Sequence, residues 1–246
     1  MKRLTNIKEI KLGIQSYTFR NFSFEKALEM INKLGINYVE ISARHVSPSL
    51  EIAEKLAEYE KIYNIRFLSH GVNPIHKDRE NIIKLLEFAK QTNISVLTAD
   101  PDPDSLDILD DILDEYKIAI AIHNHGPGHR YDTIRNILNI IKDHNELIGL
   151  CLDTGHLARA GDDIVDAVTS FDKRLYSIHL KDIDVNKKDT IIGEGILNLE
   201  KFFEKLKETD LLYWSLLTIE YEPNPENPLP GVKRSIENIY QLLKKI

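Results

Sequence analysis

Short apolar runs alternate along the chain with longer segments in which apolar residues recur at helical spacing. The short runs are nearly continuous stretches of Ile, Leu and Val, which is typical of parallel strands buried on both faces. They predict strands at residues 11–18, 38–42, 66–71, 95–100, 118–124, 148–154, 175–182 and 214–222. The amphipathic segments predict helices at residues 23–35, 48–64, 78–93, 104–117, 131–145, 162–173, 198–210 and 231–245.

Regular alternation of strand and helix with short connections indicates a parallel sheet. Eight such units in 246 residues indicate closure into a barrel, because barrels of this kind have roughly 250 residues. A doubly wound open sheet is the alternative. Since no change in composition marks a linker, we expect a single α/β domain over residues 1–246, folded as a (β/α)8 TIM barrel.

Composition narrows the class of partner. The 32 Lys and Arg against 39 Asp and Glu give a net charge of −7, which argues against nucleic acid or an anionic membrane as partner. Cys151 is the one cysteine, so an internal disulfide is impossible and a reducing compartment is expected. The segment 1–12 lacks the apolar core of a signal peptide, and no apolar run is long enough for a membrane helix. We therefore expect a cytoplasmic protein with a small-molecule ligand.

Polar residues with catalytic chemistry gather at one end of the predicted strands. The relevant segments are Ser69-His70-Gly71, Asp100, His123-Asn124-His125, Asp153-Thr154-Gly155-His156, His179-Leu180-Lys181-Asp182 and Glu220-Tyr221-Glu222. All lie at carboxyl ends of strands, where barrel enzymes place their active sites. The pattern therefore predicts an active site at this end of the barrel.

The alternation of side chains along a strand sharpens this expectation. It places His123 with His125, His179 with Lys181 and Glu220 with Glu222 on shared faces. If these faces point inward, four residues converge on the barrel axis: His123, Asp153, His179 and Glu220. Two imidazoles and two carboxylates suit one divalent ion such as Mn, Co, Fe, Zn or Mg, and catalysis needs positions left open for substrate and water.

With these residues in place, the whole chain resembles the xylose-isomerase-like TIM barrels, the sugar phosphate isomerase/epimerase group. The resemblance is carried by Leu150-Cys151-Leu152-Asp153-Thr154-Gly155-His156, Ile178-His179-Leu180-Lys181-Asp182, Gly193-Glu194-Gly195 and Ile219-Glu220-Tyr221. It implies Asp153, His179 and Glu220 as ligands of one divalent metal, and a small carbohydrate substrate. A homodimer is one option that it offers, since family members often form dimers. Where epimerases of the group usually carry Glu before Asn-His, this chain has His123; inosose-dehydratase-like members accept His there.

The departure at His123 bears on the reaction that the resemblance implies. An epimerase of this group uses two glutamates to remove and return a proton beside a carbonyl, with the metal stabilising the enediolate. Here Glu220 keeps its place, and His123 is a ligand, a general acid or base, or both. We expect a sugar isomerase or epimerase. The alternative is a dehydratase of a keto-polyol or keto-sugar, because a base with a separate acid also fits loss of water.

Further residues are candidates for contacts with substrate. His156 is expected to orient substrate and take part in catalysis, and His70 and His125 to bind substrate hydroxyls. Lys181 is expected to neutralise an oxyanion or phosphate, the alternative being an ion pair with Asp182 or Glu222. Glu40 is expected to hold His123 or a substrate hydroxyl.

Two loop segments remain to be interpreted, and two other functions are alternatives to a sugar-modifying enzyme. The run Asp100-Pro101-Asp102-Pro103-Asp104 is attributed mainly to helix capping, and the loop 126–128 to a lid or phosphate contact. Apurinic/apyrimidinic endonucleases share the barrel and an Asp-Thr-x-His motif, but they need several metals and a cationic track for DNA, which a charge of −7 does not suggest. A non-catalytic sugar-binding protein is the remaining alternative.

Overall fold

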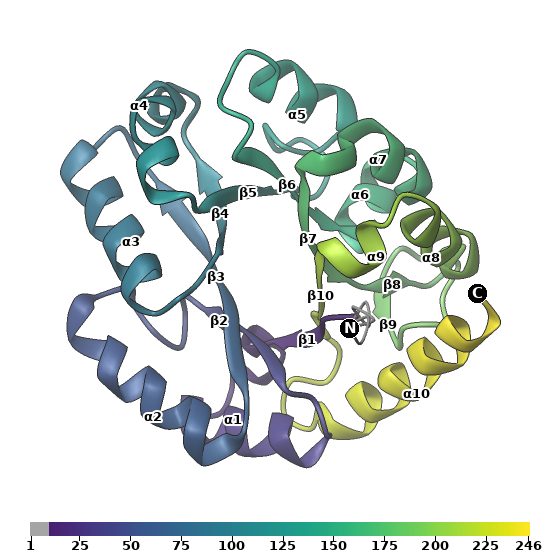
Figure 1. The fold of residues 1–246 in the computed structure, drawn as a ribbon. Coiled ribbons are helices and arrows are strands. Elements are labelled where there is room, and N and C mark those ends of the chain that lie inside the picture. Colours follow the sequence, from purple (N-terminus) through teal and green to yellow (C-terminus); the bar gives the residue numbers. More distant parts are fainter. Residues whose placement is uncertain (1–9) are drawn as a thin grey trace, which may run out of the picture.

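The computed structural model describes residues 10–246; the predicted domain also includes residues 1–9, which lie outside the described residues. Eight parallel strands close a barrel in the order β1-β10-β7-β6-β5-β4-β3-β2, seen as a ring in Figure 1. The strands are β1 (Leu12–Gln15), β2 (Tyr38–Ser42), β3 (Arg66–Ile75), β4 (Val96–Pro101), β5 (Ala119–His123), β6 (Ile148–Asp153), β7 (Leu175–Leu180) and β10 (Leu216–Ile219). The predicted closed barrel is therefore confirmed, and the open sheet is excluded.

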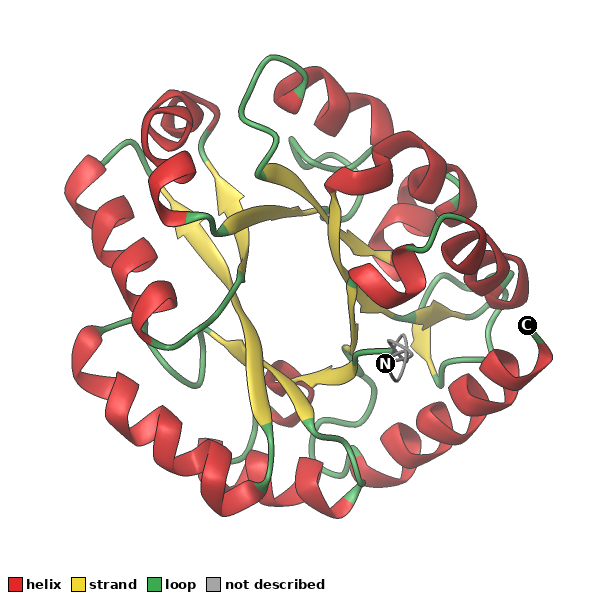
Figure 2. Cartoon of the chain, in the orientation of Figure 1, coloured by secondary structure: helices red, strands yellow, loops and turns green. Residues whose placement is uncertain are grey.

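Helices surround the ring of strands (Figure 2). They are α1 (Phe24–Lys33), α2 (Ala53–Tyr63), α3 (Arg79–Gln91), α4 (Leu106–Tyr116), α5 (Ile134–Ile141), α6 (Thr154–Ala160), α7 (Ile164–Phe171), α8 (Leu199–Glu208), α9 (Leu211–Trp214) and α10 (Leu229–Lys245). Every residue of β5 and of β6 is buried, because the helices cover the outer face of each strand and side chains fill the barrel. None of the helices between residues 10 and 246 combines the length and apolar character that a membrane crossing requires.

The first helix shows how local sequence sets the element boundaries. The Ser23 side chain accepts a hydrogen bond from the Lys26 backbone N–H and caps α1, as serine at this position commonly does. Gly35 follows the last turn with a φ of +74°, a left-handed conformation that glycine adopts without steric cost. These two residues therefore set the bounds of the helix predicted at residues 23–35.

Several boundaries differ from the prediction for local reasons. The first strand ends at Gln15 because its side chain accepts the Tyr17 N–H at 2.6 Å and starts a 3-10 helix, η1 (Ser16–Phe19). The last strand is shorter than residues 214–222, since α9 includes Trp214. The short helix α6 follows Asp153 directly, and a small antiparallel hairpin of β8 (Asp182–Ile183) and β9 (Asp189–Thr190) leaves the ring after β7. None of these features was predicted.

A contact between α1 and α2 gives a testable dependence on pH. The Tyr59 hydroxyl of α2 donates to Glu25 of α1, and this bond, with Lys55 nearby, lowers the pKa of Glu25 from 4.5 to about 2. A lowered carboxyl pKa contributes stability above the unfolded value, and this stability is lost as pH falls through the folded value. We expect Tyr59→Phe to lose about 1 kcal/mol at neutral pH. Thermal unfolding of both proteins should show this difference shrinking between pH 4.5 and 2; a constant difference would show that ring packing, not the bond, matters.

Candidate functional site

Four side chains predicted as metal ligands lie together at the carboxyl end of the barrel. His123 ends β5, Asp153 ends β6, His179 is the fifth residue of β7, and Glu220 follows β10 directly. The register of the sheet places Asp153 beside His179 and His179 beside Thr218, so neighbouring strands present these groups at one level. All four are buried, and one ligand atom from each lies within 4.8 Å of the others.

The ligand atoms of these four residues are oriented so that they could bind a cation. Within residues 10–246, His123 Nε2 and His179 Nδ1 are shielded from solvent and make no hydrogen bond. Asp153 Oδ2 and Glu220 Oε2 are equally shielded, and Lys181 lies within ion-pair distance of both. Buried polar atoms normally have a partner, so two imidazole nitrogens without hydrogen bonds that converge with two carboxylate oxygens are informative. Two imidazoles and two carboxylates suit a divalent ion of the zinc, cobalt or manganese type. The residues present therefore fit the predicted metal.

Glu40 fixes the orientation of His179 from across the barrel. Its Oε1 lies 3.0 Å from His179 Nε2, and its Oε2 accepts the Ser69 hydroxyl at 2.9 Å. Although burial opposes ionisation, attraction to His179 and these hydrogen bonds lower the pKa of Glu40. In the neutral ring, donation from Nε2 to this carboxylate would leave the Nδ1 lone pair facing the cluster, the arrangement expected for a histidine that binds metal.

Lys181 brings a buried positive charge to the same place. Its Nζ lies 3.1 Å from Asp153 Oδ2 and 3.0 Å from Glu220 Oε2. It also forms an ion pair with Glu222, which was one of the alternatives predicted for Lys181. Burial opposes this charge, but the three carboxylates hold the pKa of Lys181 well above its usual value. Since a carboxylate oxygen has two lone pairs, Asp153 and Glu220 can accept the ammonium and also face a metal.

A pocket of about 410 Å³ opens above the cluster. Its lining comprises Gln15, Tyr17, Ser42, Ala43, Arg44, Val72, His123, His125, His156, Lys181, Glu220 and Glu222. Burial and neighbouring cationic groups lower the pKa of His156. Burial, followed by the nearby His123, His129 and His156, lowers the pKa of His125 to about 3. Both rings are therefore neutral near pH 7 and can form hydrogen bonds with substrate hydroxyls.

Two predicted substrate contacts need correction. His70 is fully buried; its Nε2 lies 2.9 Å from the Val46 carbonyl oxygen, and its ring packs edge-on against Phe88. Glu40 is also fully buried and contacts His179 rather than His123 or a substrate hydroxyl. Neither side chain lines the pocket, because Glu40 points into the closed interior of the barrel toward His179, whereas His70 points outward to Phe88 of α3.

The structure also shows what Asn124 and Asp182 do, which sequence reasoning did not predict. Asn124 Oδ1 accepts the Asp153 N–H at 2.7 Å, and its Nδ2 donates to the Asp153 carbonyl at 3.0 Å, so this amide fixes Asp153 in place. Asp182 Oδ2 accepts the N–H groups of Gly193 and Gly195 at 3.0 Å each. A Cβ on Gly195 would lie 2.2 Å from Asp182 Oδ1, which explains this glycine of the Gly193-Glu194-Gly195 segment as a structural requirement.

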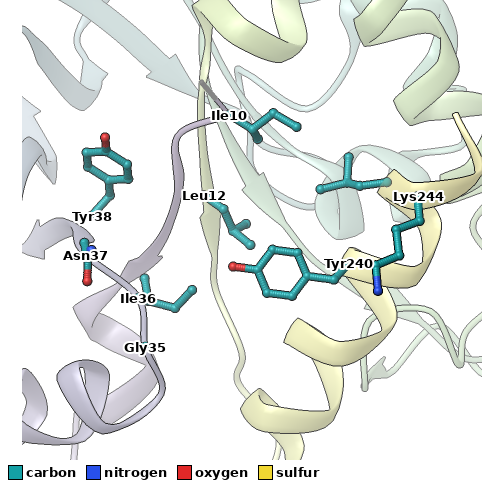
Figure 3. A pocket seen from close by; sticks show the side chains of 9 residues that line it. Ile10, Leu12, Gly35, Ile36, Asn37, Tyr38, Tyr240 and Lys244 are labelled. Atoms are coloured by element: carbon teal, nitrogen blue, oxygen red, sulfur yellow. The ribbon is translucent and has the colours of Figure 1, made fainter. Parts of the chain in front are cut away.

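A second cavity lies at the opposite end of the barrel and offers little chemistry. Its lining, drawn in Figure 3, comes from the start of β1, the turn between α1 and β2, and the end of α10. Ile10, Leu12, Ile36 and Leu243 make it largely apolar, and its lining contains no His, Asp, Glu or Cys among the described residues. The pocket over the histidines is therefore the candidate active site.

Comparisons with known proteins agree with this architecture. A sequence model of xylose isomerase-like TIM barrels matches residues 28–242, so the chain belongs to this family. It is 22% identical to inosose dehydratase of Mesomycoplasma hyopneumoniae (strain 7448) over 300 residues, covering 99% of each chain. A D-tagatose 3-epimerase-like protein superposes with a TM-score of 0.75 at 22% identity, over 95% of this chain and 97% of that one. The IOLI protein with a zinc atom gives a TM-score of 0.74 at 19% identity, over 96% and 98%.

Proposed function

We propose that this chain is a divalent-metal-dependent enzyme that removes a proton from the carbon beside the carbonyl of a keto-sugar, a keto-polyol or one of their phosphates. The observation that carries the proposal is the buried convergence of ligand atoms from His123, Asp153, His179 and Glu220 beneath the pocket, with both imidazoles presenting a nitrogen that makes no hydrogen bond. The zinc of the related IOLI structure supports it. A cation held by these residues would polarise the carbonyl and stabilise the enediolate charge.

The residues around the pocket supply the proton chemistry. Burial opposes ionisation of Glu220, but Lys181 and His179 hold the pKa of this carboxyl well below its usual value. Its Oε2 faces the cluster, which leaves Oε1 to accept the substrate proton as general base. The Lys181 ammonium lies 3.0 Å from Glu220, where it can donate to a developing oxyanion or a departing hydroxyl. The neutral His156 ring can relay a proton at the pocket wall.

Loss of water is the outcome that we favour for this enediolate. Elimination needs one base and a separate donor for the departing hydroxyl, and Glu220 with Lys181 provides that pair. His123 occupies the position where an epimerase of the group would carry a second glutamate. The inosose dehydratase that matches over 99% of both chains supports the same outcome.

Isomerisation or epimerisation, the function that the sequence led us to expect first, is the second candidate. It returns the proton to carbon, a step that His156 or His123 can perform after taking the proton up. The D-tagatose 3-epimerase-like structure supports this candidate.

Turnover in deuterated water distinguishes these outcomes. We would incubate the metal-loaded protein with a panel of ketoses, inososes and their phosphates and follow products by NMR and mass spectrometry. A dehydratase gives a product lighter by one water, whereas an isomerase or epimerase gives an isomer with deuterium beside the carbonyl. Glu220→Gln should suppress either reaction. The proposal fails if no compound in the panel exchanges a proton or changes mass.

A further inference from the structure

A second group of ligand-type side chains lies beside the pocket, outside the four-residue cluster. Asp100 lies near the end of β4, and His125 and His129 lie in the loop that follows β5. One ligand atom of each lies within 4.8 Å of the others, and all three side chains are partly buried. The capping role predicted for the Asp100–Asp104 run is not observed: η3 (Pro103–Ser105) has Asp102 at its N-cap, but the Asp102 side chain makes no capping hydrogen bond to this helix.

The spacing within this second cluster is that of groups around an ion. Asp100 Oδ2 lies 3.8 Å from His125 Nε2 and 3.6 Å from His129 Nε2, too far for hydrogen bonds. Within the described part of the chain, His125 Nε2 and Asp100 Oδ1 are shielded from solvent and have no hydrogen-bond partner. Tetrahedral zinc with bonds of about 2.0–2.2 Å holds neighbouring ligand atoms about 3.3–3.6 Å apart, close to the separations seen here.

A third cluster shows that proximity alone does not define such a site. Asp107, Asp110 and His144 also bring ligand atoms within 4.8 Å of one another. There, however, His144 Nδ1 lies 2.7 Å from Asp110 Oδ2, and Asp110 Oδ1 accepts the Asn145 N–H at 2.8 Å. These hydrogen bonds explain the third cluster as a contact between a helix and a loop. The third cluster therefore provides a matched control for metal binding by the second.

We propose that Asp100, His125 and His129 bind a second divalent cation of the zinc or cobalt type at the edge of the active-site pocket. Two imidazoles and one carboxylate form a ligand set that leaves a coordination position open. Because His125 also lines the pocket, this site borders the space available to substrate oxygens. The inference goes beyond the proposed reaction and does not depend on it.

Two neighbouring groups must adjust when the cation binds. The Tyr131 N–H donates to His129 Nδ1 at 3.3 Å; coordination through Nε2 places the ring proton on Nδ1, so this long contact opens. Arg130 Nε lies 3.7 Å from Asp100 Oδ1, but its Nη1 donates to Asp102 at 2.8 Å. Asp102 therefore already offsets part of the guanidinium charge beside the site.

Metal stoichiometry tests the proposal. The chelator-stripped protein would be titrated with Zn²⁺ and with Co²⁺ by calorimetry, and bound metal per chain measured by elemental analysis after dialysis. We expect about two ions per chain in the wild type and about one in His129→Gln and in Asp100→Asn. His144→Gln, from the hydrogen-bonded third cluster, should keep two. Circular dichroism verifies folding, and if Asp100→Asn does not fold, His129→Gln decides.

Asp153→Asn separates this inference from the proposed function. It removes a ligand only from the deep cluster, which is the set His123, Asp153, His179 and Glu220. One ion in the wild type and none in Asp153→Asn would overturn the second site and leave the deep one intact. One ion that persists in Asp153→Asn but is lost in His129→Gln would support the second site and count against the deep metal. Two ions retained in both His129→Gln and Asp100→Asn would place the second ion elsewhere and overturn the proposal.

Discussion

Asp153→Asn and Glu220→Gln are each expected to lose one bound metal ion per chain and to lower kcat/KM by about 10²–10⁴-fold. Each change replaces a carboxylate of the deep cluster with a neutral amide and removes one negative charge. The amide can turn either its oxygen or its nitrogen toward the metal position. The fold should survive in Asp153→Asn, because the retained Oδ1 still accepts the His156 N–H, a bond of 2.7 Å in the wild type. Elemental analysis and steady-state kinetics on the substrate found in the panel provide the measurements.

Glu222→Gln is the matched control for these variants. Glu222 also pairs with Lys181, but it lies at the pocket wall and is not one of the four clustered residues. We expect this variant to retain its metal and to lose less than about tenfold in kcat/KM, since a partly exposed ion pair contributes little. Equal metal content in the wild type, Asp153→Asn and Glu220→Gln would reject the four-ligand site.

The barrel and the deep cluster were predictable because their determinants are local in the sequence. Strands such as β5 and β6 are buried at every position, so they stand out as apolar runs without polar alternation. Once eight units close into a barrel, all carboxyl strand ends meet. His123, Asp153, His179 and Glu220 could therefore be grouped before any distance was known.

Contacts between distant segments could not be predicted in the same way. Alternation along a strand indicates the face that a side chain occupies, but it does not identify its neighbour across the barrel. Glu40 was expected beside His123 and instead meets His179, 139 residues away. Asp100 has the composition of a helix cap, and only the return of the loop after β5 brings His125 and His129 to it.

Glu40→Ala is expected to destabilise the metal-free protein by about 3–5 kcal/mol, because it breaks a buried charged pair and leaves its partner uncompensated. Both side chains of the Glu40–His179 pair have no solvent-exposed area, so water cannot replace the lost acceptor. Glu40→Gln keeps an oxygen that can accept from His179 Nε2 but removes the charge that makes the ring a stronger ligand. This variant should fold and bind the deep metal about 10–100-fold more weakly.

Ser69→Ala serves as the control, since it removes the hydroxyl that donates to Glu40 at 2.9 Å and leaves the carboxylate beside His179. It should lose about 1–3 kcal/mol of stability and keep its metal affinity within a few fold. Denaturant unfolding in chelator measures stability free of the contribution from bound metal, and competition with a metal indicator measures affinity. If Glu40→Gln binds the deep metal as tightly as the wild type, Glu40 supports the fold without tuning His179. If the affinity falls while Ser69→Ala is unaffected, the carboxylate positions His179 for the metal from across the barrel.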